Sequence, residues 1–131
     1  MKLALDTNAY RALTENRQEA LGLVQRADSI GMPVPVLAEL RFGFLGGTRG
    51  RQNEATLMKF LDSPRVHVLA CDEQTTHFYS QLKLQLKKQG TPIPINDVWI
   101  AALVLQHGMT LLTYDSDFDH LPQLPRASAA R

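Results

Sequence analysis

Short apolar runs alternate along this chain with longer segments that have the spacing of amphipathic helices. Runs of four or five apolar residues between turn-forming residues are typical of buried β-strands. Strands that are separated by helices usually pair in parallel through right-handed crossovers. The sequence therefore predicts an α/β three-layer sandwich with a central, mainly parallel sheet, whose strands lie at residues 2–5, 32–36, 66–70 and 109–113.

Helix-starting residues directly follow the first predicted strand. Asp6, Thr7 and Asn8 can each accept a hydrogen bond from the free N–H groups of a first helical turn. Pro33 and Pro35 indicate that the second strand is short or lies at a sheet edge. Further helices are expected from a cap at Asn16 to an end at Gly31, and over residues 37–45, 52–61, 75–89 and 98–106, with a glycine-rich basic loop at 46–51 and a turn or short helix at 114–121.

The length of 131 residues, 44% of them hydrophobic, is sufficient for one domain with one core. We expect this domain to span residues 1–121, followed by a mobile tail at 122–131 that has little to pack. The longest apolar run, 98–105, is far shorter than the ~20 residues that span a bilayer, so no membrane association is expected. Without a secretory signal, and with Cys71 as its single cysteine, the chain is expected in the cytoplasm.

The net charge of +1 hides a strong separation of charge along the sequence. Positive charge gathers in the middle of the chain, at Arg41, Arg49, Arg51, Lys59 and Arg65. No lysine or arginine lies between Lys88 and Arg126, where the chain instead carries Asp97, Asp115, Asp117 and Asp119. Uncompensated negative charge opposes folding unless it is well solvated or binds a cation. The separation suits a protein that binds both a polyanion and a metal ion.

Three aspartates follow strand ends or begin helices. Asp6 directly follows the first strand, Asp115 follows the last, and Asp97 opens a helix. Because the binding crevice of a parallel sheet lies beyond the carboxyl ends of its strands, these side chains are expected to converge there. Glu39 lies in an otherwise apolar helical segment, where a carboxylate needs a partner, a raised pKa or a metal. Four carboxylates in one site favour Mg²⁺ or Mn²⁺, which prefer oxygen ligands.

Structural roles remain open for several of the acids at this point. Asp6 and Asp97 are residue types that commonly cap helices. Glu39 has Arg41 two residues away as a candidate ion-pair partner. Asp117 and Asp119 are residue types that are common in solvated turns.

Four segments together resemble the PIN-domain ribonucleases, and among them the VapC toxins of bacterial toxin–antitoxin pairs. The resemblance runs from about residue 1 to residue 121, with the motifs in the family's order and spacing. The segments are Leu5-Asp6-Thr7-Asn8, Ala38-Glu39-Leu40-Arg41-Phe42-Gly43, Asn96-Asp97-Val98-Trp99-Ile100-Ala101-Ala102 and Leu112-Thr113-Tyr114-Asp115-Ser116-Asp117-Phe118.

This resemblance implies a Mg²⁺-dependent endoribonuclease, with Mn²⁺ able to substitute, that hydrolyses RNA phosphodiester bonds. It also implies a homodimer that is inhibited by a cognate VapB-type antitoxin. By motif, the catalytic acids and metal ligands are Asp6, Glu39, Asp97 and Asp115, with Asp117 as a further ligand and Asn8 and Thr113 as residues that orient the site.

Contacts to RNA phosphates are expected from the basic residues Arg41, Arg49 and Arg51. The alternative is a catalytically silent domain of the same fold that binds RNA or a partner protein without cleaving it.

Overall fold

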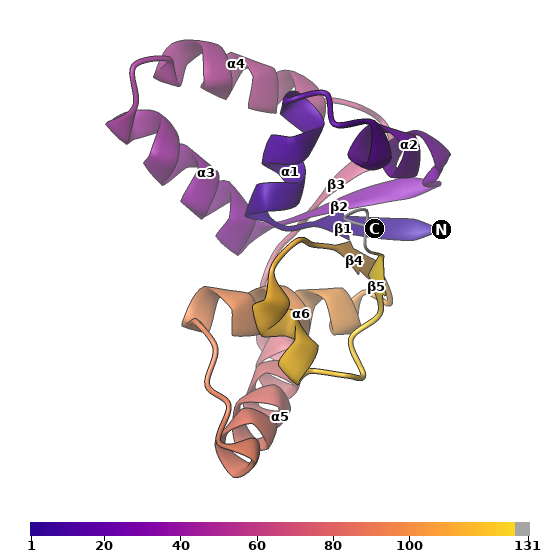
Figure 1. Ribbon diagram of the computed structural model, residues 1–131, viewed down its shortest axis with the longest axis vertical. Helices are drawn as coiled ribbons and strands as arrows, with labels where there is room; N and C mark the ends of the chain where they lie inside the picture. Colours follow the sequence, from indigo (N-terminus) through magenta and orange to yellow (C-terminus); the bar gives the residue numbers. More distant parts are fainter. Residues whose placement is uncertain (128–131) are drawn as a thin grey trace.

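A five-stranded parallel sheet runs through the middle of the molecule (Figure 1). The computed structural model describes residues 1–127. The strands follow the spatial order β3-β2-β1-β4-β5, and every neighbouring pair is parallel. Their bounds are β1 (Lys2–Leu5), β2 (Ser29–Pro33), β3 (Val66–Leu69), β4 (Thr110–Leu112) and β5 (Arg126–Ala127).

Helices cover both faces of this sheet. Figure 1 shows α1, α2 and the paired helices α3 and α4 on one side, with α5 and α6 on the other, which confirms the predicted three-layer sandwich. No helix in the described part of the chain combines the length and apolar character needed to cross a membrane. The helices are α1 (Thr7–Thr14), α2 (Gln18–Arg26), α3 (Val34–Gly46), α4 (Gly50–Leu61), α5 (Glu73–Gln89) and α6 (Ile95–Gln106), with the 3₁₀-helix η1 at Ser116–His120.

The core lies on both faces of the middle strands. Leu3 and Leu5 of β1 and Leu111 and Leu112 of β4 are fully buried. Such continuous apolar strands are expected where helices cover both faces of a sheet. In α6, the residues from Ile100 to Val104 are all buried, so this helix is apolar nearly all round.

The second strand differs from its prediction in place and in neighbours. It lies between β1 and β3 rather than at an edge, and it ends at Pro33. Pro35 falls in the first turn of α3, where a backbone N–H has no helical partner to lose. Gly31 was expected to end a helix but lies inside β2, where a Cβ atom would sit 2.5 Å from Sδ of Met109. This close approach explains the glycine.

The helix before this strand also begins later than expected. Its N-cap is Arg17, whereas the predicted cap, Asn16, adopts a left-handed backbone with φ of 60°. Asparagine tolerates this conformation better than most residues do, so Asn16 turns the chain between α1 and α2.

The C-terminal segment packs further along the chain than predicted. Leu124 is buried, and Arg126–Ala127 form β5 beside β4. The N–H of Leu111 donates to the carbonyl oxygen of Pro125 at 2.8 Å. The expectation that residues from 122 onward have little to pack is therefore wrong up to residue 127. The rest of the predicted mobile tail, residues 128–131, lies outside the described residues.

The strand order determines where a site can form. From β1 the chain moves to β2 and β3 on one side, and it returns to β4 on the other side of β1. In such sheets a crevice opens beyond the carboxyl ends of the two strands where the order reverses. Here those strands are β1 and β4, and the residues that follow them are Asp6 and Thr113.

Candidate active site

Asp6 connects the end of β1 to the start of α1. It is the N-cap of α1, and its Oδ1 accepts a hydrogen bond from the N–H of Ala9 at 2.8 Å. Its Oδ2 accepts one from the hydroxyl of Thr113. The side chain is only 5% exposed. The capping role is thus real, and it places Asp6 at the crevice with a fixed orientation.

Thr113 links the two strand ends. Its hydroxyl donates to Asp6 and accepts from the N–H of Asp115 at 2.9 Å. Asp115 in turn is the N-cap of η1, and its Oδ1 accepts from the N–H of Asp117 at 2.9 Å. A single hydroxyl therefore orients both Asp6 and the turn that carries Asp115 and Asp117.

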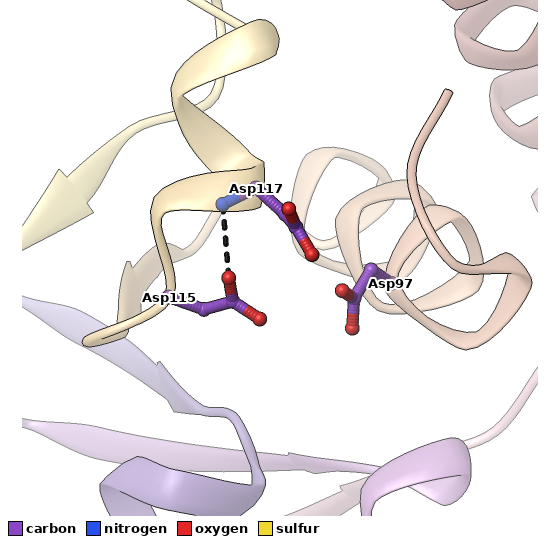
Figure 2. Close-up of side chains that lie close together, drawn as sticks. All are labelled: Asp97, Asp115 and Asp117. Carbon is purple, nitrogen blue, oxygen red and sulfur yellow. Dashed lines mark hydrogen bonds between the residues drawn. The ribbon is translucent and has the colours of Figure 1, made fainter. Parts of the chain in front are cut away.

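Asp97 enters the same space from the first turn of α6. Pro94 is the N-cap of this helix, so the capping alternative for Asp97 is wrong. Figure 2 shows the carboxylates of Asp97, Asp115 and Asp117 facing one another. One oxygen from each lies within 4.8 Å of the others, and all three side chains are half-buried. The structure thus brings Asp117 into the cluster rather than leaving it in a solvated turn.

Glu39 reaches the site from α3. Its Oε1 accepts a hydrogen bond from the hydroxyl of Thr7 at 2.6 Å. Arg41 instead forms a bidentate ion pair with Glu54 of α4. Its Nε donates to Oε1 and its Nη2 donates to Oε2, the latter at 3.0 Å. The alternative that Arg41 neutralises Glu39 is therefore wrong.

One cleft of about 490 Å³ is lined by the four acids that the sequence motifs predict as metal ligands. Faces of α1, α3 and α6 form its wall together with Asp115 at the start of η1, and the exposed side chain of Asn8 lies on this wall. The residues on the wall are Asp6, Thr7, Asn8, Arg11, Glu39, Phe42, Gly43, Asp97, Ile100 and Asp115.

The carboxyl groups of the cleft cannot all ionise without repelling one another. Burial, and after it the charges of Asp115 and Glu39, raise the pKa of Asp97 to about 7. Burial also raises the pKa of Asp6, against the hydrogen bonds from Thr113 and Ala9 that lower it. Either protons or a cation relieve this repulsion. Because the donors are carboxylate oxygens, the residues fit a hard divalent cation.

The basic residues near the acidic cleft lie partly on its wall and partly beside it. Arg49 and Arg51 are exposed at the start of α4, beside the acidic cleft rather than on its wall. Arg11 was not among the predicted site residues, but it lies on the wall itself. Its position three residues after Asn8 on α1 is the signal that was available, because residues three apart share a helix face. Asp119 points elsewhere and forms an ion pair with Arg126.

Comparisons with known proteins agree with this architecture. The family model described as the PIN domain matches residues 3–124. Ribonuclease VapC5 of Mycobacterium tuberculosis is 32% identical over 117 residues, which cover 87% of this chain and 83% of that protein. The VapBC-1 structure from nontypeable Haemophilus influenzae contains a chain that is 30% identical, with a TM-score of 0.85 and full coverage of both chains. VapBC2 from Rickettsia felis, solved with a promoter DNA fragment, has 27% identity, a TM-score of 0.84 and 98% coverage of both. VapC ribonucleases are thus among the relatives of this chain, and the chain belongs to the PIN domain family.

Proposed function

We propose that this protein is a divalent-metal-dependent endoribonuclease toxin that hydrolyses RNA phosphodiester bonds and is inhibited by a VapB-type antitoxin. The observation that carries the proposal is the convergence of Asp6, Glu39, Asp97 and Asp115 on one cleft, with Asp117 beside them. The similar VapC proteins support the proposal, since they are named ribonucleases.

Asp97, Asp115 and Asp117 are the residues we expect to hold the ion, because their oxygens already lie close together. We propose Mg²⁺, for which Mn²⁺ can substitute, since both prefer oxygen ligands. When bound, such an ion supplies charge neutralisation at the phosphate and lowers the pKa of a coordinated water. Asp6 and Glu39 lie on the same cleft and complete its acidic wall.

Neighbouring hydroxyl groups hold these acids in place. Thr113 fixes Asp6, and Thr7 fixes Glu39, so neither carboxylate is free to rotate away from the cleft. We assign Thr113 a positioning role for this reason. Asn8 lies at the exposed rim, where we expect its amide to orient the substrate or a ligand of the ion.

We extend the proposal to the partners and location that the family implies. The structures of the relatives from H. influenzae and R. felis are of VapBC pairs, which supports a VapB-type antitoxin for this chain. A homodimer and a cytoplasmic location are proposed on the same family basis. The free, exposed Cys71 is compatible with a reducing compartment.

Cleavage of total RNA tests the proposed function. Antitoxin-free protein is incubated with Mg²⁺ or Mn²⁺, with EDTA, and as the Asp97→Asn variant, which keeps the shape of the side chain and removes its charge. Asp62→Asn, at an exposed position outside the cleft, is the matched control. Defined fragments that disappear with EDTA and with Asp97→Asn, but persist with Asp62→Asn, are the expected result. Folded protein that cleaves none of several RNA pools would favour the silent binding domain.

A further inference from the structure

Three hollows adjoin one another from the acidic cleft to the start of α4. The acidic cleft shares Arg11 and Gly43 with a second hollow of about 590 Å³, which lies among α1, α3 and α4. The second hollow shares Arg49 with a third, which Arg51 also lines. Because neighbouring hollows share residues on their walls, they lie side by side in a row from the acidic cleft to the start of α4. We call this row the arginine groove, defined by Arg11, Gly43, Arg49 and Arg51.

Gly43 lies beside Arg11 at the boundary between the first two hollows. A Cβ atom on Gly43 would sit 3.4 Å from Nη2 of Arg11, which is about a van der Waals contact. Glycine is unfavourable inside a helix, and Gly43 lies inside α3. Without a side chain, Gly43 leaves this side of the Arg11 guanidinium uncovered.

The arginines of the groove have guanidinium groups that are available to a ligand. All three are exposed, and none takes part in the ion pairs found among residues 1–127. Arg11 has only a long contact to Asn8, at 3.4 Å, and Arg49 uses only its Nε to bind Gln52. Glu15 is the single acid on the wall of the second hollow. The groove is thus cationic, in contrast to Arg41, whose charge Glu54 already neutralises.

An exposed aromatic ring lies where the groove meets the acidic cleft. Phe42 is 81% exposed and lines the cleft beside Gly43. Proteins that bind single-stranded nucleic acid combine a cationic groove along the backbone with aromatic side chains on which bases stack. Arginines that can bind phosphates and an aromatic ring that can stack on a base therefore lie together next to the acids.

We propose that a single-stranded RNA lies along the arginine groove, with Arg11 on the phosphate beside the scissile one and Arg49 and Arg51 on phosphates farther away. Phe42 stacks on a base at the cleft. This inference rests on the proposed function and adds the path of the substrate to it. These contacts bind the backbone and one base face, so they supply affinity and direction rather than recognition of sequence.

The salt dependence of RNA binding tests the proposal. A fluorescein-labelled single-stranded RNA of mixed sequence is titrated with the full chain in EDTA, which keeps the RNA intact. For single strands the slope of log affinity against log salt falls by about 0.7 for each phosphate contact that is lost. We expect this reduction for Arg11→Ala, Arg49→Ala and Arg51→Ala, whereas Arg26→Ala, on α2 and away from the groove, keeps the slope.

Two further variants separate charge from stacking. Arg11→Lys should keep most of the slope, since it keeps the charge, although it loses the forked geometry of arginine. Phe42→Ala should weaken binding with no change of slope, because stacking releases no counterions.

The outcomes separate this inference from the proposed function. Slopes for the three groove variants equal to that of Arg26→Ala would overturn the path, even if the unaltered protein cleaves RNA. If the three groove variants bind RNA as the unaltered protein does but bind an aspartate-rich peptide more weakly, the RNA path is overturned in favour of a protein occupant. Reduced slopes in a protein that cleaves no RNA would support the path and refute the nuclease.

Discussion

Replacing Asp97 with asparagine is expected to stabilise the metal-free protein at neutral to alkaline pH while it abolishes cleavage. Burial and the neighbouring carboxylates raise the pKa of Asp97 to about 7 in the folded protein, whereas an unfolded aspartate has a pKa of about 3.9. Hydrogen bonding is not among the causes that shift the pKa of Asp97. The asparagine thus removes a charge and leaves existing hydrogen bonds in place.

The size and the pH window of this effect follow from the two pKa values. Because the folded-state pKa is the higher one, ionisation of Asp97 destabilises the folded protein, and the cost grows from about pH 4 to about pH 7. At about 1.4 kcal/mol for each pKa unit, the cost above pH 7 is at most about 4 kcal/mol. Screening by water and sharing of the repulsion among the acids reduce this to an expected gain of about 1–3 kcal/mol for the variant.

Urea unfolding in EDTA, followed by circular dichroism, measures this gain. The variant should exceed the unaltered protein in free energy of unfolding at about pH 8, and the difference should vanish at about pH 4. Asp62→Asn is the control and should show no such pH dependence. Added Mg²⁺ should stabilise the unaltered protein more than Asp97→Asn, because the variant lacks a ligand. A variant no more stable than the unaltered protein at about pH 8, or equally stabilised at both pH values, would refute the electrostatic argument.

Three other substitutions test the residue that positions the acids, a contact at the end of α2 and the packing of the core. Thr113→Val removes the hydroxyl between Asp6 and Asp115 and should lower both the cleavage rate and, by about 1–3 kcal/mol, the free energy of unfolding. Arg65→Ala removes two hydrogen bonds, of 3.1 and 2.6 Å, to carbonyl groups at the end of α2, which should cost about 1–2 kcal/mol in chemical denaturation. Leu103→Ala opens a cavity at a fully buried position of α6, with an expected cost of about 2–5 kcal/mol by the same measurement.

Conservative variants supply the controls for these three. Thr113→Ser keeps the hydroxyl, and a cleavage rate as low as that of Thr113→Val would contradict the positioning role. Arg65→Lys keeps a donor and should lose less stability than Arg65→Ala. Leu103→Met keeps the volume and should cost under about 1.5 kcal/mol. Equal losses in Leu103→Met and Leu103→Ala would mean that cavity formation is not the cause.

The positions of the acids could be predicted from the sequence because they depend on local signals. Asp6 follows an apolar run directly, and Asp115 follows another, so a parallel topology alone brings them to one edge. The order of the strands around β1 then makes that edge a crevice. Asp117 was harder to place, since the same residue type in a turn is usually solvated.

Pairings between distant segments explain what the sequence did not reveal. The partner of Arg41 is Glu54, on a helix whose packing against α3 no local pattern encodes. The spacing of Arg11 from Asn8 indicates a shared helix face, but the packing of α1 beside α3 is what places that face on the cleft. The strand β5 has two residues, which is too short for any alternation of apolar and polar side chains.

The adjacency of β1 and β4 has a consequence during protein synthesis. The hydroxyl of Thr113 meets Asp6 across 107 positions of sequence, and β1 pairs with β4 along its length. Chains fold from the N-terminus while they emerge from the ribosome. A nascent chain that has released only α1 to α5 lacks Asp97, Asp115 and Asp117 and cannot assemble the acidic cluster. Since the proposed cleavage requires these acids, the growing polypeptide cannot attack the RNA that surrounds it until nearly all of its length has been synthesised.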